Sequence, residues 1–371
     1  MTQQTTGAHL RAHDEESGST DVLATLEHFR TLVAPALRET VRRLPPEISS
    51  TVEYTLGWRD ADGTPRSGGS GKGLRPALAM LTAQAVGAAP ESAVAGALAV
   101  ELVHTFSLVH DDIIDGDEQR RHRDAVWKAY GIGTAVLVGD ALLALALDAL
   151  SRAAADKTGP AAMKALSNAL VELVNGQAQD VSFELRPWTG PQAVTVAEYT
   201  AMAGRKTGSL LGCATGLGAL LGGAGPGTVK DLTGMGRHLG LAFQAVDDLL
   251  GIWGDPSVTG KPVHSDLRQR KKTLPIVAVL AEDTPAARRL AELLEAAPVT
   301  PDGPEADAAN AEENLRRAAN LIDEAGGRAL AADSAQRHLC RAQHLIHRTA
   351  VDGSAAATLA ALGEFAVHRT H

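Results

Sequence analysis

Residues 108–123 read LVHDDIIDGDEQRRHR, and residues 243–255 read FQAVDDLLGIWGD. Each stretch ends an apolar run with two adjacent aspartates, and the hydrophobic residues of each run recur at the spacing of a helix buried on one face. Carboxylates packed at the end of a buried helix repel one another unless something offsets their charge, and divalent cations are the obvious candidate. These two stretches therefore predict helices that carry metal ligands.

The composition of the chain also favours helices. Aromatic residues make up only 3% of the 371 residues, whereas alanine, leucine and glycine abound, which favours close-packed helices over strands. Apolar-periodic segments at residues 77–87, 91–114, 133–155, 160–184, 196–222 and 227–253 are separated by short Gly or Pro breaks, without an alternating strand pattern between them. We expect an all-α chain with a single domain over residues 21–371 and loops near 57–73 and 297–308.

Residues 1–20 are polar, which is typical of a disordered tail. The first helix is expected to begin near Ser19 to Asp21 and to end before Pro45 and Pro46. We recognise neither a signal peptide nor an apolar run long and unbroken enough to span a bilayer, so we expect a cytoplasmic protein that is not an integral membrane protein. A net charge of −9 disfavours nucleic acid as a partner.

The first aspartate cluster has the spacing of a metal site. Asp111 and Asp115 are four residues apart and share a helix face, with Asp112 beside them. Oxygen ligands of this kind indicate Mg²⁺, or Mn²⁺ in its place. An EF-hand is excluded, because Ile113 and Ile114 interrupt its alternating acidic positions. The plain alternative is a solvated helix end, where the helix dipole disfavours acidic residues.

Basic residues accompany the cluster. Arg120 and Arg121 directly follow it, and paired guanidinium groups beside metal ligands suit a diphosphate that bridges both. Lys72 and Arg75 belong to the segment GGSGKGLRP, which is not a Walker loop because Arg66 replaces the first glycine of that motif. These two residues can still meet a phosphate at a helix N-terminus.

The second cluster suggests another ion. Asp247 and Asp248 would hold it, and Gln244 lies one helical turn before Asp248. Downstream, Lys261 and Lys271 add positive charge to a loop that could close over an anionic ligand, although an exposed basic loop is the simpler interpretation.

The motifs, taken in order, are GK-x-x-RP, DD-x-x-D with a trailing arginine pair, KT at Lys206 and Thr207, FQ-x-x-DD, and GK. Together they resemble the trans-isoprenyl diphosphate synthase (polyprenyl synthetase) family over residues 30–290, and they are most similar to its bacterial geranylgeranyl diphosphate synthases. The resemblance implies an isoprenoid synthase-type helical bundle around a deep central cavity. It also implies a homodimer that catalyses Mg²⁺-dependent head-to-tail condensation of isopentenyl diphosphate with an allylic diphosphate.

The resemblance further implies roles for individual residues. Isopentenyl diphosphate would be held by Lys72, Arg75, His104 and Arg121, and Lys271 is expected to contact substrate as well. The allylic diphosphate would be gripped by Arg120, Lys206 and Lys261, together with Mg²⁺ bound to Asp111, Asp112, Asp115, Asp247 and Asp248. Thr207 and Gln244 would lie near the developing cation, and Phe106 would line the cavity wall.

Some features leave alternatives open. Gly251 stands where many relatives have a third aspartate in the second motif, and Asp255 is a candidate substitute. Phe106 followed by the small Ser107 resembles the pattern of geranylgeranyl (C20) synthases, with farnesyl (C15) or longer products as alternatives. A type I terpene cyclase would want Ser or Thr at position 251 and Glu at position 255, so it ranks lower, as does a non-catalytic partner or cargo subunit.

Overall fold

Helices make up nearly all the regular structure in the computed structural model, which describes residues 5–66, 71, 73–153, 158–260, 262–296 and 305–367. In chain order they are α1 (Thr5–Val41), α2 (Pro46–Thr55), α3 (Leu74–Ala85), the 3-10 turn η1 (Pro90–Ala93), α4 (Val94–Asp115), α5 (Val126–Tyr130), α6 (Ile132–Ala153), α7 (Gly159–Glu184), α8 (Val196–Ala203), the π-helical segment η2 (Gly204–Gly208), α9 (Ser209–Leu221), α10 (Pro226–Trp253), α11 (Pro256–Thr259), α12 (Ser265–Arg268), α13 (Leu274–Leu280), α14 (Pro285–Glu295), α15 (Glu305–Glu324), α16 (Gly327–Thr349) and α17 (Gly353–Val367). Two short antiparallel strands, β1 (Gln119–Arg120) and β2 (Arg123–Asp124), form a hairpin. The predicted all-α class is confirmed.

The first helix begins earlier than the sequence suggested. It is helical from Thr5, whereas we expected a disordered tail to residue 20 and a start near Ser19 to Asp21. Several alanine, leucine and glutamate residues between positions 8 and 16 are good helix formers, and the first proline of the helix is Pro35. Helix propensity thus outweighs the polar composition on which the expectation rested. Part of the loop expected near 297–308 lies outside the described residues, and α15 already begins at Glu305.

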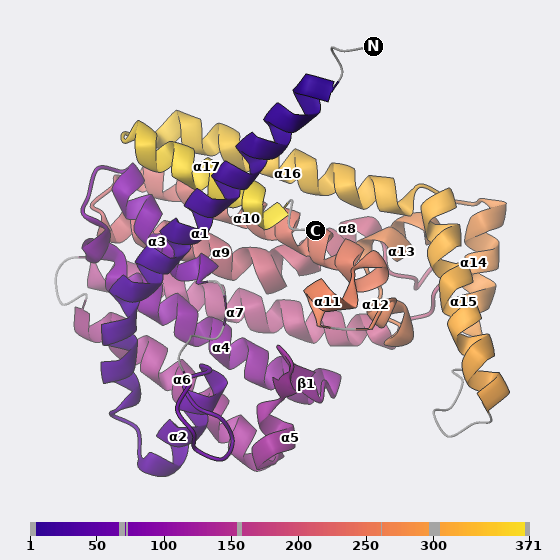
Figure 1. Ribbon diagram of the computed structural model, residues 1–371, viewed down its shortest axis with the longest axis horizontal. Coiled ribbons are helices and arrows are strands. Elements are labelled where there is room, and N and C mark those ends of the chain that lie inside the picture. The colour runs from indigo at the N-terminus through magenta and orange to yellow at the C-terminus, as the bar shows by residue number, and fades with distance from the viewer. Residues whose placement is uncertain are drawn as a thin grey trace. The chain divides into compact units, whose positions relative to one another are not determined.

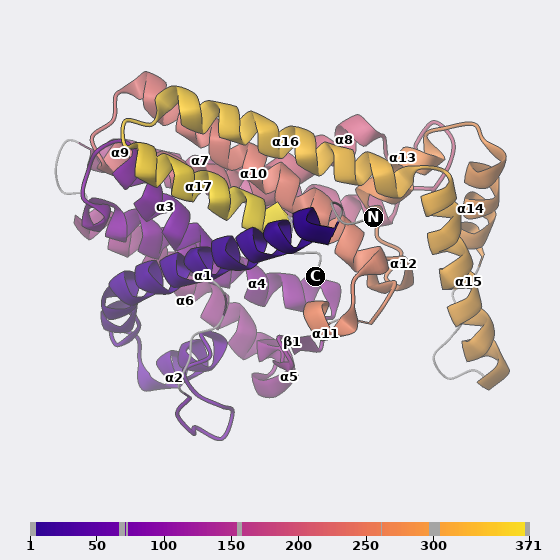
Figure 2. The same ribbon diagram turned by 45° about the horizontal axis from the view of Figure 1, so that its top comes forward.

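The chain packs into two compact units that each draw on separate stretches of sequence. Unit 1 contains residues 1–168, 210–236 and 343–365, and unit 2 contains residues 169–209, 237–342 and 366–371. In unit 1, α4 and α6 lie side by side (Figure 1). Fully buried side chains there include Leu78, Met80, Leu102, Leu142, Leu150, Leu217 and Met235. The core of unit 2 gathers Trp188, Ile252, Ile276, Leu290 and Ile322, and α14 and α15 lie against each other at its edge (Figure 2).

Close helix packing in unit 1 depends on Gly218 of α9. A Cβ atom at this position would lie 2.1 Å from the backbone oxygen of Ala79 in α3, so any side chain would force the two helices apart. Gly218→Ala should lower the free energy of unfolding by about 3 kcal/mol, as overpacking against a rigid backbone does. Urea unfolding followed by circular dichroism measures this. Gly227→Ala is the matched control, because a Cβ atom at position 227 would meet nothing within 4 Å, and equal losses in both variants would contradict the prediction.

Two histidines of unit 2 make a pH-sensitive contact. The Nδ1 atoms of His238 on α10 and His338 on α16 lie 3.0 Å apart, so one must donate a proton and the other must accept it. The pKa of His338 is lowered to about 4, chiefly by burial and then by the nearby His238, Arg341 and Arg337. The pKa of His238 is also lowered, chiefly by burial and then by Arg341. The folded state therefore favours the neutral pair.

This contact predicts a loss of stability in acid. A histidine whose folded pKa lies below its ordinary 6.5 stabilises the fold above that pH, and this stabilisation disappears as the pH falls from 6.5 toward 4. The free energy of unfolding should therefore fall more steeply over this range for the native chain than for His338→Gln, whose side chain does not titrate. Urea unfolding at successive pH values measures both slopes. Parallel slopes would show that the pair does not contribute.

Two stretches differ from the expectation that no apolar run is long enough to span a bilayer. The stretches Pro90–Asp115 and Ile132–Arg152 are long and apolar enough to span a bilayer by length and composition, although we expected no such run. Each contains few charged residues, so its average hydropathy stays high despite the polar side chains that interrupt it. Most of the first stretch is buried, as in a core helix, and length and composition alone are weak evidence for a span.

Candidate active site

The hairpin after α4 places two arginines against that helix. Helix α4 ends at Asp115, with Gly116 as its left-handed cap, and the chain then forms β1 and β2. Arg121 and His122 are the two central residues of the turn, with φ values of 54° and 61°. A two-residue turn of type I′ has positive φ at both positions, which glycine and asparagine adopt more easily than arginine or histidine. Strained backbone of this kind is typical of functional sites.

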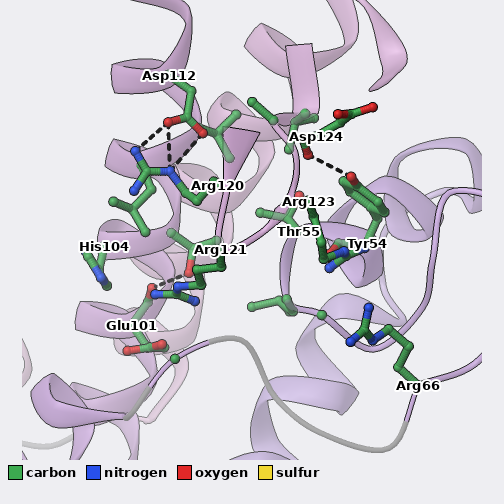
Figure 3. A pocket seen from close by; sticks show the side chains of 18 residues that line it. Tyr54, Thr55, Arg66, Glu101, His104, Asp112, Arg120, Arg121, Arg123 and Asp124 are labelled. Atoms are coloured by element: carbon green, nitrogen blue, oxygen red, sulfur yellow. Dashed lines mark hydrogen bonds and ion pairs between the residues drawn. The ribbon is translucent and has the colours of Figure 1, made fainter. Parts of the chain in front are cut away.

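Asp112 and Arg120 form a buried ion pair. The Arg120 Nε lies 2.7 and 2.9 Å from the two carboxylate oxygens, and the Asp112 side chain is only 3% exposed. Figure 3 shows the guanidinium and carboxylate groups facing each other. Asp111 and Asp115 are only half-buried, so they form the more accessible edge of the cluster. The structure thus gives the adjacent aspartates different surroundings.

A pocket of about 330 Å³ lies beside this ion pair in unit 1. Glu101, His104 and Arg121 stand together in its wall (Figure 3). Burial lowers the pKa of His104 well below its ordinary range, and the charges of Arg75, Arg121 and Arg120 lower it further. The imidazole is therefore neutral, and the positive charge of the pocket comes from arginine.

Glu101 faces the same arginines. Burial raises the pKa of its carboxyl group, and the charges of Arg75 and Arg121 partly offset that rise. For Arg121, burial lowers the pKa of the guanidinium and the Glu101 charge opposes that change. A carboxylate such as Glu101 can orient neighbouring arginine side chains and still leave the pocket attractive to an anion such as a phosphate.

The far wall of the pocket was not identified from the sequence. The Arg123 guanidinium stacks on the Tyr54 ring at 4.0 Å and donates to the backbone oxygens of Tyr54 and Arg59 at 3.0 and 2.8 Å. The Tyr54 hydroxyl donates to the Asp124 backbone oxygen at 2.7 Å (Figure 3). This wall comes from α2 and β2, segments 69 residues apart, and local spacing carries no signal for such a contact.

The remaining residues predicted for the site in unit 1 are Arg75, Lys72 and Phe106. Arg75 lies in the first turn of α3, as expected for a phosphate-binding residue, while Lys72 lies outside the described residues. Gly71 approaches the Arg121 guanidinium so closely that a Cβ atom would be 2.9 Å from Nη2. Phe106 is 8% exposed and packs edge-on against His110, and it is not among the described residues that line the pocket.

The second motif lies on α10 in unit 2. Asp247 is half-buried, whereas Asp248 is 2% exposed. Asp248 accepts hydrogen bonds from the Tyr199 hydroxyl, from Gln244 Nε2 at 3.1 Å and from the Leu274 backbone N–H at 2.8 Å. Burial raises the pKa of Asp248 to about 7 even though these three donors lower it. Its carboxylate therefore ties α8, α10 and α13 together.

Lys206 and Thr207 lie on η2, where the helix widens to a π turn. The Lys206 ammonium donates to Asp180 at 2.6 Å, and the Thr207 hydroxyl donates to Gln244 Oε1 at 2.6 Å. Glycine at position 176 lets α7 approach, because a Cβ there would lie 2.4 Å from the Lys206 backbone nitrogen. π turns occur frequently at functional sites. Thr207, Gln244, Asp248 and Tyr199 thus form one hydrogen-bonded chain. Sequence reasoning missed Tyr199, and it also missed Asp180, the partner of Lys206.

The basic loop after α10 is only partly described. Lys261 lies outside the described residues, and Lys271 donates its backbone N–H to the Asp266 backbone oxygen at 2.9 Å. The neighbouring Lys272 lies over the Trp188 ring at 4.2 Å, and burial lowers its pKa to about 8. Lys272 is therefore packed into unit 2, whereas Lys271 is half-buried.

The donor chemistry of both motifs fits a hard divalent cation. In the part of the chain that the structure describes, no three His, Cys, Asp or Glu side chains are grouped closely enough to hold a metal by themselves. Mg²⁺ commonly binds through one or two carboxylates, with water and substrate phosphates completing the shell. Asp111 with Asp115, and Asp247 on α10, provide carboxylates of that kind.

A family model and several known proteins match this chain. A family model described as polyprenyl synthetase matches residues 67–306. A (2E,6E)-farnesyl diphosphate synthase of Mycobacterium tuberculosis is 43% identical over 356 residues, which is 96% of each chain. A geranylgeranyl diphosphate synthase of the same organism is 41% identical over 304 residues, covering 82% of this chain and 83% of that protein.

Solved structures show the same relationship. A polyprenyl synthetase from Streptomyces coelicolor A3(2) superposes with a TM-score of 0.86 at 50% identity, covering 93% of this chain and 99% of that one. A polyprenyl synthase from Caulobacter crescentus, complexed with calcium and isoprenyl diphosphate, gives a TM-score of 0.77 at 27% identity over 94% and 98% of the two chains. The chain belongs to the polyprenyl synthetase family, so it is a prenyltransferase with the all-α isoprenoid synthase fold. The family acts on isoprenyl diphosphates and uses divalent metals.

Proposed function

We propose that this enzyme condenses isopentenyl diphosphate head-to-tail with an allylic diphosphate, with Mg²⁺ as cofactor and geranylgeranyl diphosphate (C20) as product. The observation that carries the proposal is the pocket of unit 1, in which Arg121 and neutral His104 stand beside the Asp112–Arg120 ion pair. A diphosphate is the anion that several guanidinium groups and nearby metal-binding carboxylates would hold together.

The residues divide the chemistry between binding and charge stabilisation. Arg121, His104 and Arg75 would hold the diphosphate of isopentenyl diphosphate, while Arg120 and Lys206 would contact the allylic diphosphate. Asp112 and Asp180 fix the orientation of those two cations through their ion pairs. Bound Mg²⁺ would neutralise the charge that develops on the departing diphosphate. Preorganised cations of this kind contribute most where charge develops in the transition state.

The bond changes follow from this arrangement. The allylic C1–O bond breaks and its electron pair leaves with the diphosphate. The isopentenyl double bond attacks the allylic carbon, and the proton lost from the isopentenyl unit passes to the released diphosphate. Thr207 and Gln244, joined by a 2.6 Å hydrogen bond, would lie near the developing cation, where oxygen atoms could stabilise its charge. The resemblance implies an apolar cavity around the growing chain, which would exclude the water that would otherwise convert the cation into an alcohol.

The C20 product is proposed from the residues before the first motif. Phe106 is followed by the small Ser107, whose hydroxyl donates back to the His104 carbonyl at 2.9 Å. The relatives include both a farnesyl and a geranylgeranyl synthase at similar identity, so overall identity does not select a chain length.

We further propose that the protein is a cytoplasmic homodimer, that it does not bind nucleic acid and that it is not an integral membrane protein. Exposed apolar side chains on one side of α6 support a second copy as the partner, namely Ile132, Val136 and Leu137 with exposures of 57%, 39% and 58%. Sedimentation velocity should then give the mass of two chains, and a monomer at micromolar concentration would reject the dimer.

The decisive experiment supplies the purified chain with Mg²⁺, isopentenyl diphosphate and, in turn, a C5, C10 or C15 allylic diphosphate. Mass spectrometry of the products should show C20 diphosphate as the end product, and omission of Mg²⁺ with added chelator should abolish it. Absence of elongation with every starter would reject the proposed condensation. Products that stop at C15, or continue past C20, would reject the chain length alone.

A further inference from the structure

The two aspartate motifs have the same arrangement of buried and accessible carboxylates, except at their last position. In the first, Asp112 is buried in an ion pair, and Asp111 and Asp115, four residues apart, remain on the more accessible face of α4. In the second, Asp248 is buried among three donors, and Asp247 corresponds to Asp111. The residue four positions after Asp247 is Gly251, so the second helix lacks the carboxylate that Asp115 supplies in the first.

A carboxylate from another segment fills this position. A Cβ atom at position 251 would lie 2.0 Å from Asp266 Oδ2 and 2.3 Å from its Cγ. The Asp266 carboxylate therefore occupies the volume that a side chain at position 251 would take, and the two cannot coexist without movement. Asp266 belongs to α12, which follows α10 within unit 2.

Hydrogen bonds of Asp266 and its neighbours hold this residue in position. The Ser265 hydroxyl donates to the Gly251 carbonyl oxygen at 3.1 Å, and the His264 N–H donates to the Ile252 carbonyl oxygen at 3.3 Å. On the other side, the Lys271 N–H donates to the Asp266 carbonyl oxygen at 2.9 Å. The start of α12 is thus fastened to the end of α10.

The alternative substitute, Asp255, is already used in another way. It is the N-cap of α11, where its Oδ1 accepts from the Ser257 N–H at 2.8 Å and from the Ser257 hydroxyl at 2.7 Å. Such a cap fixes the start of a helix and points the carboxylate at backbone donors. Proximity to Gly251 therefore favours Asp266.

We propose that Asp266 supplies the metal-facing carboxylate that Gly251 lacks, so that Asp247 and Asp266 together bind the divalent cation of the second motif. The inference rests on the proposed Mg²⁺-dependent function and deepens it by naming one ligand. A glycine at position 251 is then required, because it makes room for the carboxylate that arrives from α12.

Metal binding tests this without turnover. Binding of Mn²⁺ to the purified chain is followed by the electron paramagnetic resonance signal of free Mn²⁺, in the presence of inorganic diphosphate and without allylic substrate. Asp266→Asn should weaken the second-motif site by about tenfold or more, the range expected when a supporting carboxylate is lost. Asp255→Asn is the matched control and should bind Mn²⁺ like the native chain, because asparagine preserves the helix cap.

A reciprocal exchange separates ligand loss from misfolding. Gly251→Asp combined with Asp266→Gly moves the carboxylate onto α10 and should recover most of the affinity that Asp266→Asn loses. Unchanged Mn²⁺ affinity in Asp266→Asn, an equal loss in Asp255→Asn, or failure of the exchange to recover binding would each overturn the inference. The elongation assay on the native chain decides the proposed function separately, so a native chain that elongates while Asp266→Asn binds Mn²⁺ normally rejects only the role of Asp266.

Discussion

Asp111→Asn should lower the rate of prenyl elongation by about a thousandfold, the upper range for removing one group that stabilises transition-state charge. Asp111 is half-buried on the accessible face of α4, so its carboxylate can bind a cation that contacts the substrate diphosphate. Asparagine keeps the shape of the side chain and removes the charge. The free energy of unfolding should therefore stay nearly unchanged while the rate falls.

Initial rates at saturating substrates, measured over a range of Mg²⁺ concentrations, check this expectation. Glu118→Gln is a suitable control, because Glu118 directly precedes β1 and pairs at 3.0 Å with Lys128 on the surface. Glu118→Gln also removes a negative charge, yet the elongation rate of this variant should match that of the native enzyme. Native-like elongation by Asp111→Asn would show that this carboxylate does not hold the catalytic metal.

Asp112→Asn should reduce both stability and activity. It removes the charge opposite Arg120 in a pair whose carboxylate is 3% exposed and whose guanidinium is 32% exposed. Breaking a buried ion pair leaves an uncompensated charge and costs about 3–5 kcal/mol, and partial exposure of Arg120 reduces our expectation to about 2 kcal/mol. The rate should fall as well, because Arg120 loses the partner that fixes its orientation.

A double variant distinguishes the two effects. Asp112→Asn with Arg120→Gln removes both charges, so urea unfolding should recover much of the stability that the single variant loses. Elongation should remain impaired, because the guanidinium expected to contact the diphosphate is absent. A single variant as stable as the native chain would show that the pair contributes nothing to folding, and recovery of activity in the double variant would remove Arg120 from the site.

Sequence reasoning located the helices that carry the aspartates, because apolar periodicity is a local signal that survives in the fold. It could not assign different surroundings to neighbouring aspartates. Asp248 is buried by donors from Tyr199 and Leu274, which lie 49 and 26 residues away. Such contacts depend on tertiary packing, and spacing along one helix does not reveal them.

The hairpin was missed for a different reason. Its turn residues, Arg121 and His122, are not the glycine or asparagine that normally mark a two-residue turn. The strands have only two residues each, which is too short for an alternating pattern. An arginine and a histidine at the turn positions therefore leave no turn signal in the sequence.

The π-helical segment η2 places a constraint on insertions and deletions. A π turn holds more residues than an α turn, so deleting one residue between Gly204 and Gly208 would restore a regular helix and rotate the flanking residues by about 100°. Lys206 and Thr207 would then no longer reach Asp180 on α7 and Gln244 on α10 at the same time. A deletion scan should find this short stretch as intolerant as the hydrophobic core, although its polar sequence resembles that of a permissive surface.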